Sequence, residues 1–156
     1  MAEPMGDLLN SAVREVADTL PGVVLQAEGA RAVPSDGTAD LSALVGMSGG
    51  VRGCLRLAGE RAAILRLAAA LLGETRDRWD DELEDAFAEL ANLVAGGLQG
   101  RLEPSLGAIR LTPPSVILGR GQRVFGPREW QCAAHGFSLS GPQFFTEFHY
   151  SAMGRH

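Results

Sequence analysis

One helical segment constrains the fold of this chain more than any other part. From about residue 81 to residue 103, apolar side chains recur at steps of three and four residues, the period of a helix that packs one face on a core. Asp81 and Glu84 have the spacing of a capping box at its start, and Pro104 is expected to end it. The apolar stripe consists of Leu83, Phe87, Leu90, Val94 and Leu98.

A second stripe on the same segment is polar and contains glycine. It consists of Asp85, Glu89, Asn92, Gly96 and Gln99, two residues out of phase with the first. Two residues turn a helix by about 200°, so this stripe is predicted to face away from the core. Glu89 and Asn92 then reach one partner together. Gly96 and Gly97 each cost about 0.5–1 kcal/mol relative to alanine. Two explanations stay open: a solvated face whose glycines admit a neighbouring strand, or a surface that another molecule approaches closely.

Two shorter helices and several short strands are predicted in the rest of the chain. The helices are expected at residues 7–20, between Asp7 and Pro21, and at residues 60–72, which Gly73 ends. Strands are expected at residues 22–33, with a bulge at Gly29, and in a hairpin over residues 41–59. Further short strands follow residue 107, with a turn at residues 140–142. The pattern predicts an α+β fold with a mixed or antiparallel sheet against three helices, as one domain over residues 1–156 with its core at about 5–152.

Composition excludes several classes of function. The chain of 156 residues has a formal net charge of −5, which gives no overall attraction for nucleic acid or for an anionic membrane. It contains no lysine, which excludes a Schiff-base or P-loop lysine. Its apolar runs are shorter than the roughly 18–20 residues of a membrane span. The N-terminal residues lack the pattern of a signal peptide, so a cytoplasmic location is expected.

The cysteines and histidines show no metal-ligand spacing. Cys54 and Cys132 are too few for a disulfide framework and do not form a C-x-x-C pair, so two buried free thiols are expected. His135, His149 and His156 lie at spacings that predict no metal site. We therefore expect no metal or cofactor on this chain.

The segment DAFAELANLVAG, residues 85–96, resembles the signature of the CheC/CheX/FliY phosphatases of bacterial chemotaxis. In that signature an Asp or Ser is followed, after three residues, by Glu and, after two more, by Asn. Asp85, Glu89 and Asn92 occupy these places, and Pro113 and Pro114 fall one or two residues before a proline of the family. The order of predicted elements agrees over roughly residues 5–152.

With one complete motif, the chain is most similar to the CheX branch. Ser11, Glu15 and Asp18 in the first helix repeat the spacing, but an aspartate stands where a second Asn would be. An aspartate has no amide donor, so this second motif is expected to be inactive or coincidental.

The resemblance implies hydrolysis of the aspartyl phosphate on a CheY-type response regulator. Glu89 and Asn92 are then the expected catalytic residues, with Asn92 positioning the attacking water. Asp85, Gly96, Gly97 and Gln99 would contact the partner, and Mg²⁺ would belong to the receiver domain of that partner. The resemblance also implies a homodimer formed by strand pairing. The alternative is a non-catalytic adaptor of the same fold that binds a receiver domain or a flagellar-switch component.

Overall fold

Three helices and seven strands make up the computed structural model, which describes residues 4–30, 39–120 and 126–152. The helices are α1 (Met5–Ala17), α2 (Arg61–Leu72) and α3 (Asp81–Leu106). The strands are β1 (Gln26–Ala30), β2 (Leu41–Gly49), β3 (Val51–Gly59), β4 (Ile109–Leu111), β5 (Ser115–Leu118), β6 (Gln131–Ser138) and β7 (Gln143–Ala152). No helix in these ranges has the length and apolar character needed to cross a membrane.

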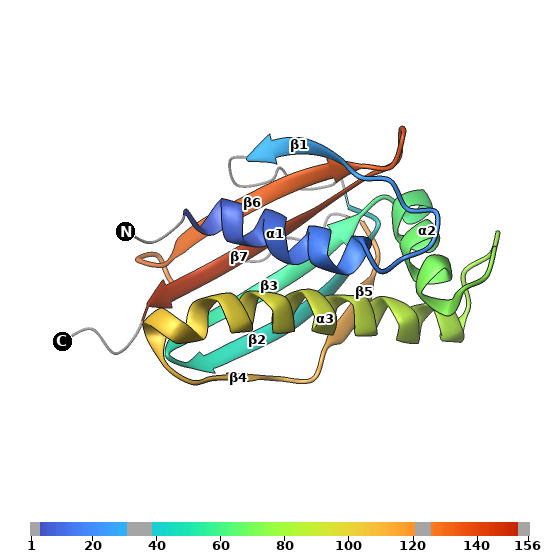
Figure 1. Cartoon of the computed structure of the whole chain (residues 1–156). Coiled ribbons are helices and arrows are strands. Elements are labelled where there is room, and N and C mark those ends of the chain that lie inside the picture. The colour runs from blue at the N-terminus through green and yellow to red at the C-terminus, as the bar shows by residue number, and fades with distance from the viewer. Residues whose placement is uncertain (1–3, 31–38, 121–125, 153–156) are drawn as a thin grey trace.

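All the strands join one antiparallel sheet, in the order β1-β6-β7-β3-β2-β4, with β5 also paired to β2. The three helices lie together on one face of this sheet, where α1 and α3 pack side by side and run in opposite directions (Figure 1). Successive side chains of a strand point to opposite faces, so Leu55, Leu57, Phe144 and Phe148 pack under the helices. This arrangement confirms the predicted α+β fold.

The hairpin of β2 and β3 brings two glycines against the end of α3. Gly49 has a φ of +103°, which a side chain would strain. A Cβ atom on Gly50 would collide with the carbonyl oxygen of Leu106, the last residue of α3. The predicted hairpin is therefore confirmed, and its glycines also allow the turn to touch the helix.

The structure corrects several predicted helix ends. Helix α1 begins at Met5 after Pro4, without a side-chain cap, and ends at Ala17 rather than at residue 20. Beyond Ala17 the chain tightens into three-residue turns, in which the Leu20 N–H donates to the Ala17 carbonyl at 3.0 Å. Helix α2 ends as predicted, at Gly73 in the left-handed conformation.

The predicted start of α3 at about residue 81 is confirmed, but its predicted capping residue and its predicted end are wrong. The capping residue is Asp80, not Asp81, because its side chain accepts the Leu83 N–H at 2.9 Å. Pro104 lies inside the last turn and does not end the helix. Because proline has no backbone N–H, Pro104 removes only one hydrogen bond of the helix there. The Gly107 N–H still donates to the Glu103 carbonyl at 2.9 Å.

One buried hydroxyl lies in the apolar layer beneath the helices. Thr146 is 0% exposed, and its Oγ1 has no hydrogen-bond partner among the described residues. It stands on β7 between Phe144 and Phe148, on the same face of the sheet. A buried polar group without a partner costs about 1–3 kcal/mol of folding free energy.

Replacing this hydroxyl with a methyl group is expected to stabilise the protein. Thr146→Val should raise the free energy of unfolding by about 1 kcal/mol, because an unsatisfied group is lost and the volume is kept. Urea denaturation followed by circular dichroism measures the change. Ser42→Ala is the matched control and should lower the free energy of unfolding, because the buried Ser42 hydroxyl accepts a hydrogen bond from Arg56 Nε at 3.1 Å. An unchanged or lowered midpoint for Thr146→Val would contradict the expectation.

Candidate functional site

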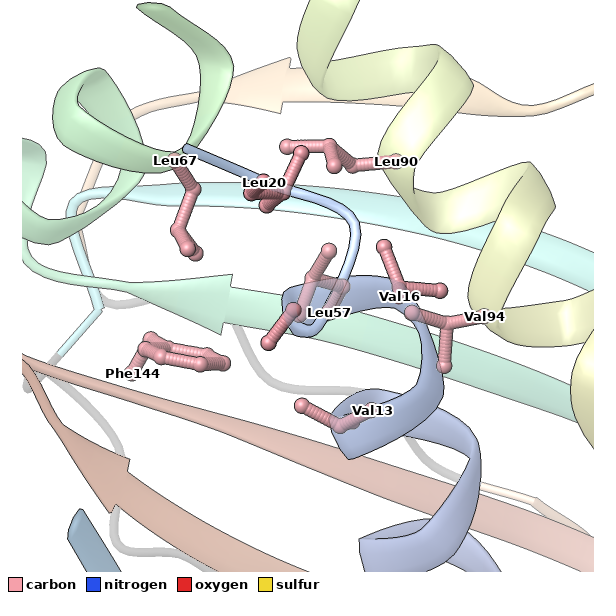
Figure 2. A pocket seen from close by; sticks show the side chains of 9 residues that line it. Val13, Val16, Leu20, Leu57, Leu67, Leu90, Val94 and Phe144 are labelled. Atoms are coloured by element: carbon pink, nitrogen blue, oxygen red, sulfur yellow. The ribbon is translucent and has the colours of Figure 1, made fainter. Parts of the chain in front are cut away.

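The inner face of α3 is fixed by apolar packing alone. Leu83, Phe87 and Leu98 are 0% exposed, and Leu90 and Val94 are 2% exposed. Figure 2 shows Leu90 and Val94 directed toward α1, α2 and the sheet, where they surround a small apolar cavity with Val13, Val16, Leu20, Leu57, Leu67 and Phe144. This cavity of about 20 Å³ offers no polar partners for a water molecule. The chemistry of α3 must therefore lie on its other face.

The outer face of α3 carries the polar stripe, as the sequence predicts. Asp85 and Glu89 are exposed, and Asn92, Gly96 and Gln99 are half-buried. Within the part of the chain that the structure describes, the side chains of Asp85, Glu89 and Asn92 make no hydrogen bond or ion pair. Glu89 and Asn92 are three residues apart and so lie on one side of the helix. Both polar groups are available to another molecule.

A shallow hollow lies beside Asn92. It is lined by Glu15, Val16, Thr19, Asn92, Leu93, Gly96, Gly97, Gln99 and Leu111. Gly96 lines it, and a Cβ atom there would project into open space, with no described atom within 4 Å apart from the helix's own backbone. Asp85 and Glu89 are not part of this lining and precede it on the same helix. The structure thus brings four of the predicted residues to one depression and places the other two next to it along α3.

Gly97 has different surroundings from Gly96. A Cβ atom on Gly97 would lie 3.4 Å from Arg101 Nη1, 3.4 Å from Glu15 Oε1 and 3.5 Å from Ala12 Cβ. Arg101 Nη1 donates to Glu15 Oε1 at 2.8 Å and to the Gly97 carbonyl at 3.0 Å. Gly97 therefore lies beneath an ion pair that joins α1 to α3, at the edge of the hollow.

The amide of Gln99 is used within the protein. Its Nε2 donates to the Ile109 carbonyl at 2.7 Å, while the Ile109 N–H donates to Glu103 Oε2 at 2.9 Å. These two bonds attach the start of β4 to the last turns of α3. Gln99 thereby holds β4 in place beside the hollow that it lines. Pro113 and Pro114 lie between β4 and β5 and do not line the hollow.

The repeated spacing on α1 does not reproduce the free pair of α3. Glu15 is held by Arg101 at 2.8 Å, and Asp18 is the capping residue directly after the end of α1. Glu89 has no such partner in the described structure. This difference agrees with a single complete motif.

Sequence reasoning missed several residues that shape the hollow. Leu93 is 39% exposed, and its position next to Asn92, off the apolar stripe of α3, was a detectable signal. Thr19 and Leu111 come from other segments, and no local pattern marks them. The hollow offers amide and carboxylate groups but no histidine or cysteine. It is suited to orienting a water molecule and an oxyanion, and it contains no strong nucleophile.

Comparisons with known proteins find related sequences and related folds. A family profile described as chemotaxis phosphatase CheX matches residues 41–138, more than half of the chain, and this range includes the whole motif. The CheY-P phosphatase CheX of Thermotoga maritima is 32% identical over 85 residues, which cover 54% of this chain and 55% of that protein. The match thus spans about half the length of this curated relative.

Solved structures share the fold at lower identity. The crystal structure of the chemotaxis protein CheX from Vibrio vulnificus has a TM-score of 0.81 and 23% identity, covering 94% of this chain and 99% of that one. A CheX–CheY–BeF₃–Mg²⁺ complex from Borrelia burgdorferi has a TM-score of 0.72 and 22% identity, covering 94% of this chain and 95% of that one.

Proposed function

This chain belongs to the chemotaxis phosphatase CheX family, and we propose that it hydrolyses the aspartyl phosphate of a CheY-type response regulator. One observation carries the proposal: Glu89 and Asn92 lie together on the outer face of α3, without hydrogen-bond or ion-pair partners among the described residues, beside a hollow that Gly96 lines. The matching relative from Thermotoga maritima is named a CheY-P phosphatase, which supports the same activity here.

Asn92 is proposed to position the attacking water. Its amide oxygen accepts a hydrogen bond from water, and its NH₂ group donates to a phosphoryl oxygen. A receiver domain already supplies the phosphoryl group and a cationic side chain, so an aligned water is the missing component. Mg²⁺ is proposed to stay with the receiver domain, because the hollow offers no set of metal ligands. The solved complex of a CheX relative with CheY contains Mg²⁺ and BeF₃.

Glu89 is proposed to orient the partner. Its exposed carboxylate, one turn before Asn92, would pair with a lysine of the receiver domain near the phosphorylated aspartate. Asp85 would extend this acidic surface by a further turn, and Gly96 would let the partner's backbone come close. Gly97 and Gln99 would hold the surface in shape through their contacts with α1 and β4.

Removal of the Asn92 amide tests the catalytic role. Asn92→Ala should slow dephosphorylation of the phosphorylated receiver by roughly 10²-fold or more, because the reacting water loses its alignment. The rate is measured as loss of aspartyl phosphate at saturating protein. Asn10→Ala is the control, since it also removes an amide from a helix surface, in this case one that accepts from Arg14 at 3.2 Å. A native rate for Asn92→Ala would refute the assignment.

The same assay separates the phosphatase from the adaptor. Binding of the receiver domain without faster hydrolysis, across the response regulators of the organism, would favour the adaptor.

Asn92→Asp keeps the size of the side chain but loses the NH₂ donor and adds a negative charge near the phosphoryl group. It should therefore be no faster than Asn92→Ala.

Filling the floor of the hollow tests the docking surface. Gly96→Ala should raise the stability of the free protein by about 0.5–1 kcal/mol, since the helix gains propensity and the methyl group meets nothing. It should nevertheless slow dephosphorylation about tenfold or more by displacing the partner. Gly100→Ala is the matched control, because Gly100 lies in the same helix, also with open space around an added Cβ atom, but does not line the hollow. Equal activity of the two variants would contradict the proposal.

We also propose that the chain forms a homodimer by strand pairing. Strand β1 is at one end of the sheet order, and its Gln26, Ala27 and Glu28 are exposed. An edge strand presents unpaired backbone groups that a second copy can bind. Sedimentation velocity should give the mass of two 16.5 kDa chains. The mass of a single chain at every concentration would contradict this expectation.

A further inference from the structure

A group of polar side chains is buried on the face of the sheet opposite the helices. Cys132 and His149 are cross-strand partners of β6 and β7, and Glu147 lies two residues before His149. Alternation along β7 directs Glu147 and His149 away from Phe148, which packs under the helices. Glu147 is 2% exposed, His149 is 7% exposed, and Cys132 is half-buried.

Two of the distances between their ligand atoms match those between neighbouring ligands of a tetrahedral metal site. Cys132 Sγ lies 3.7 Å from His149 Nε2, which lies 3.5 Å from Glu147 Oε1, and all three atoms are within 4.8 Å of one another. The second distance is long for a hydrogen bond. With metal–ligand distances of about 2.0–2.3 Å, neighbouring ligands of tetrahedral zinc lie about 3.3–3.7 Å apart. Across the described ranges, no other group of three or more His, Cys, Asp or Glu side chains brings its ligand atoms within 4.8 Å of one another.

We propose that Cys132, Glu147 and His149 bind one zinc ion. A thiolate, an imidazole and a carboxylate form a donor set that suits Zn²⁺, whereas Mg²⁺ and Ca²⁺ take oxygen ligands. Three protein ligands leave the fourth position to water. The ion links β6 to its neighbour β7 on the face of the sheet opposite the helices. It is therefore remote from Asn92 and takes no part in the proposed hydrolysis.

Arg56 supports this site from the neighbouring strand. Its Nη1 donates to Glu147 Oε1 at 2.9 Å, and its Nε donates to Ser42 Oγ at 3.1 Å. A carboxylate oxygen has room for a further partner, and hydrogen bonds from outside orient ligating carboxylates. The guanidinium also offsets the charge of Glu147. The affinity for the ion therefore depends most on the thiolate of Cys132.

Cys54 provides a matched control on the other side of His149. It is the β3 partner of His149, just as Cys132 is the β6 partner. The two cysteines are thus two strand spacings apart, about 9–10 Å, which exceeds the reach of a disulfide. Cys54 Sγ lies 3.9 Å from the Leu55 carbonyl and does not belong to the three-ligand group.

The metals themselves test the proposal on the full chain. After treatment with a chelator and its removal, the protein should bind one equivalent of Zn²⁺ in competition with a chromophoric chelator. Co²⁺ should give the visible bands of tetrahedral coordination and a thiolate-to-cobalt charge-transfer band. Cys132→Ser should abolish that band and weaken zinc binding at least 100-fold, beyond the usual loss from altering an outer hydrogen bond.

The control variants make each outcome decisive. Cys54→Ser should keep the stoichiometry, the affinity and the cobalt spectrum, and Cys132→His should retain zinc without the charge-transfer band. Circular dichroism checks that each variant is folded. Substoichiometric zinc in the wild type, or an unchanged affinity in Cys132→Ser, would overturn the site. None of these measurements depends on phosphatase activity, so failure here leaves the proposed function untouched.

Discussion

The apolar packing of α3 against the sheet determines what its opposite face presents. Each of the five buried side chains of the stripe contributes about 1.5–3 kcal/mol. The two glycines together cost only about 1–2 kcal/mol in helix propensity. The burial term wins by a wide margin, so α3 keeps its orientation despite Gly96 and Gly97. Any rotation that hid Asn92 would expose Leu90 or Val94, which line the apolar cavity together with side chains of α1, α2 and the sheet (Figure 2).

The two adjacent glycines have separate structural reasons. Gly97 faces α1, where the Glu15–Arg101 pair crosses it, so its small size allows one helix to approach another. Gly96 faces open space, because a Cβ atom there would meet no described atom within 4 Å apart from the helix's own backbone. The sequence left a choice between internal packing and an approaching partner. The structure supports packing against a helix at Gly97. The open space at Gly96 is what the proposed approach of a partner requires.

The sequence pattern predicted those features of the fold that depend on neighbouring residues along the chain. The phase of α3, the hairpin and the stop at Gly73 follow from side-chain period and backbone freedom. The capping residue of α3 was missed by one residue, because a single hydrogen bond from the Leu83 N–H to Asp80 decides it. The neighbours of Glu15 and Cys132 were beyond reach, because Arg101 lies 86 residues from Glu15 and strand register sets the partner of Cys132. Histidine spacing along the chain carries no signal for a cluster built across two strands.

The charge around the hollow bears on what the proposed enzyme would select. Asp85 and Glu89 are exposed near it, Glu15 lines it, and the whole chain is acidic, so a free phosphate would meet repulsion. A phosphorylated receiver brings its own compensation, since Mg²⁺ and a lysine accompany its phosphoryl group. The acidic surface then favours the cations that surround the phosphate. The hollow has no free cation of its own to hold a phosphate. It would therefore select a phosphoryl group that is bound to a protein and accompanied by that protein's cations.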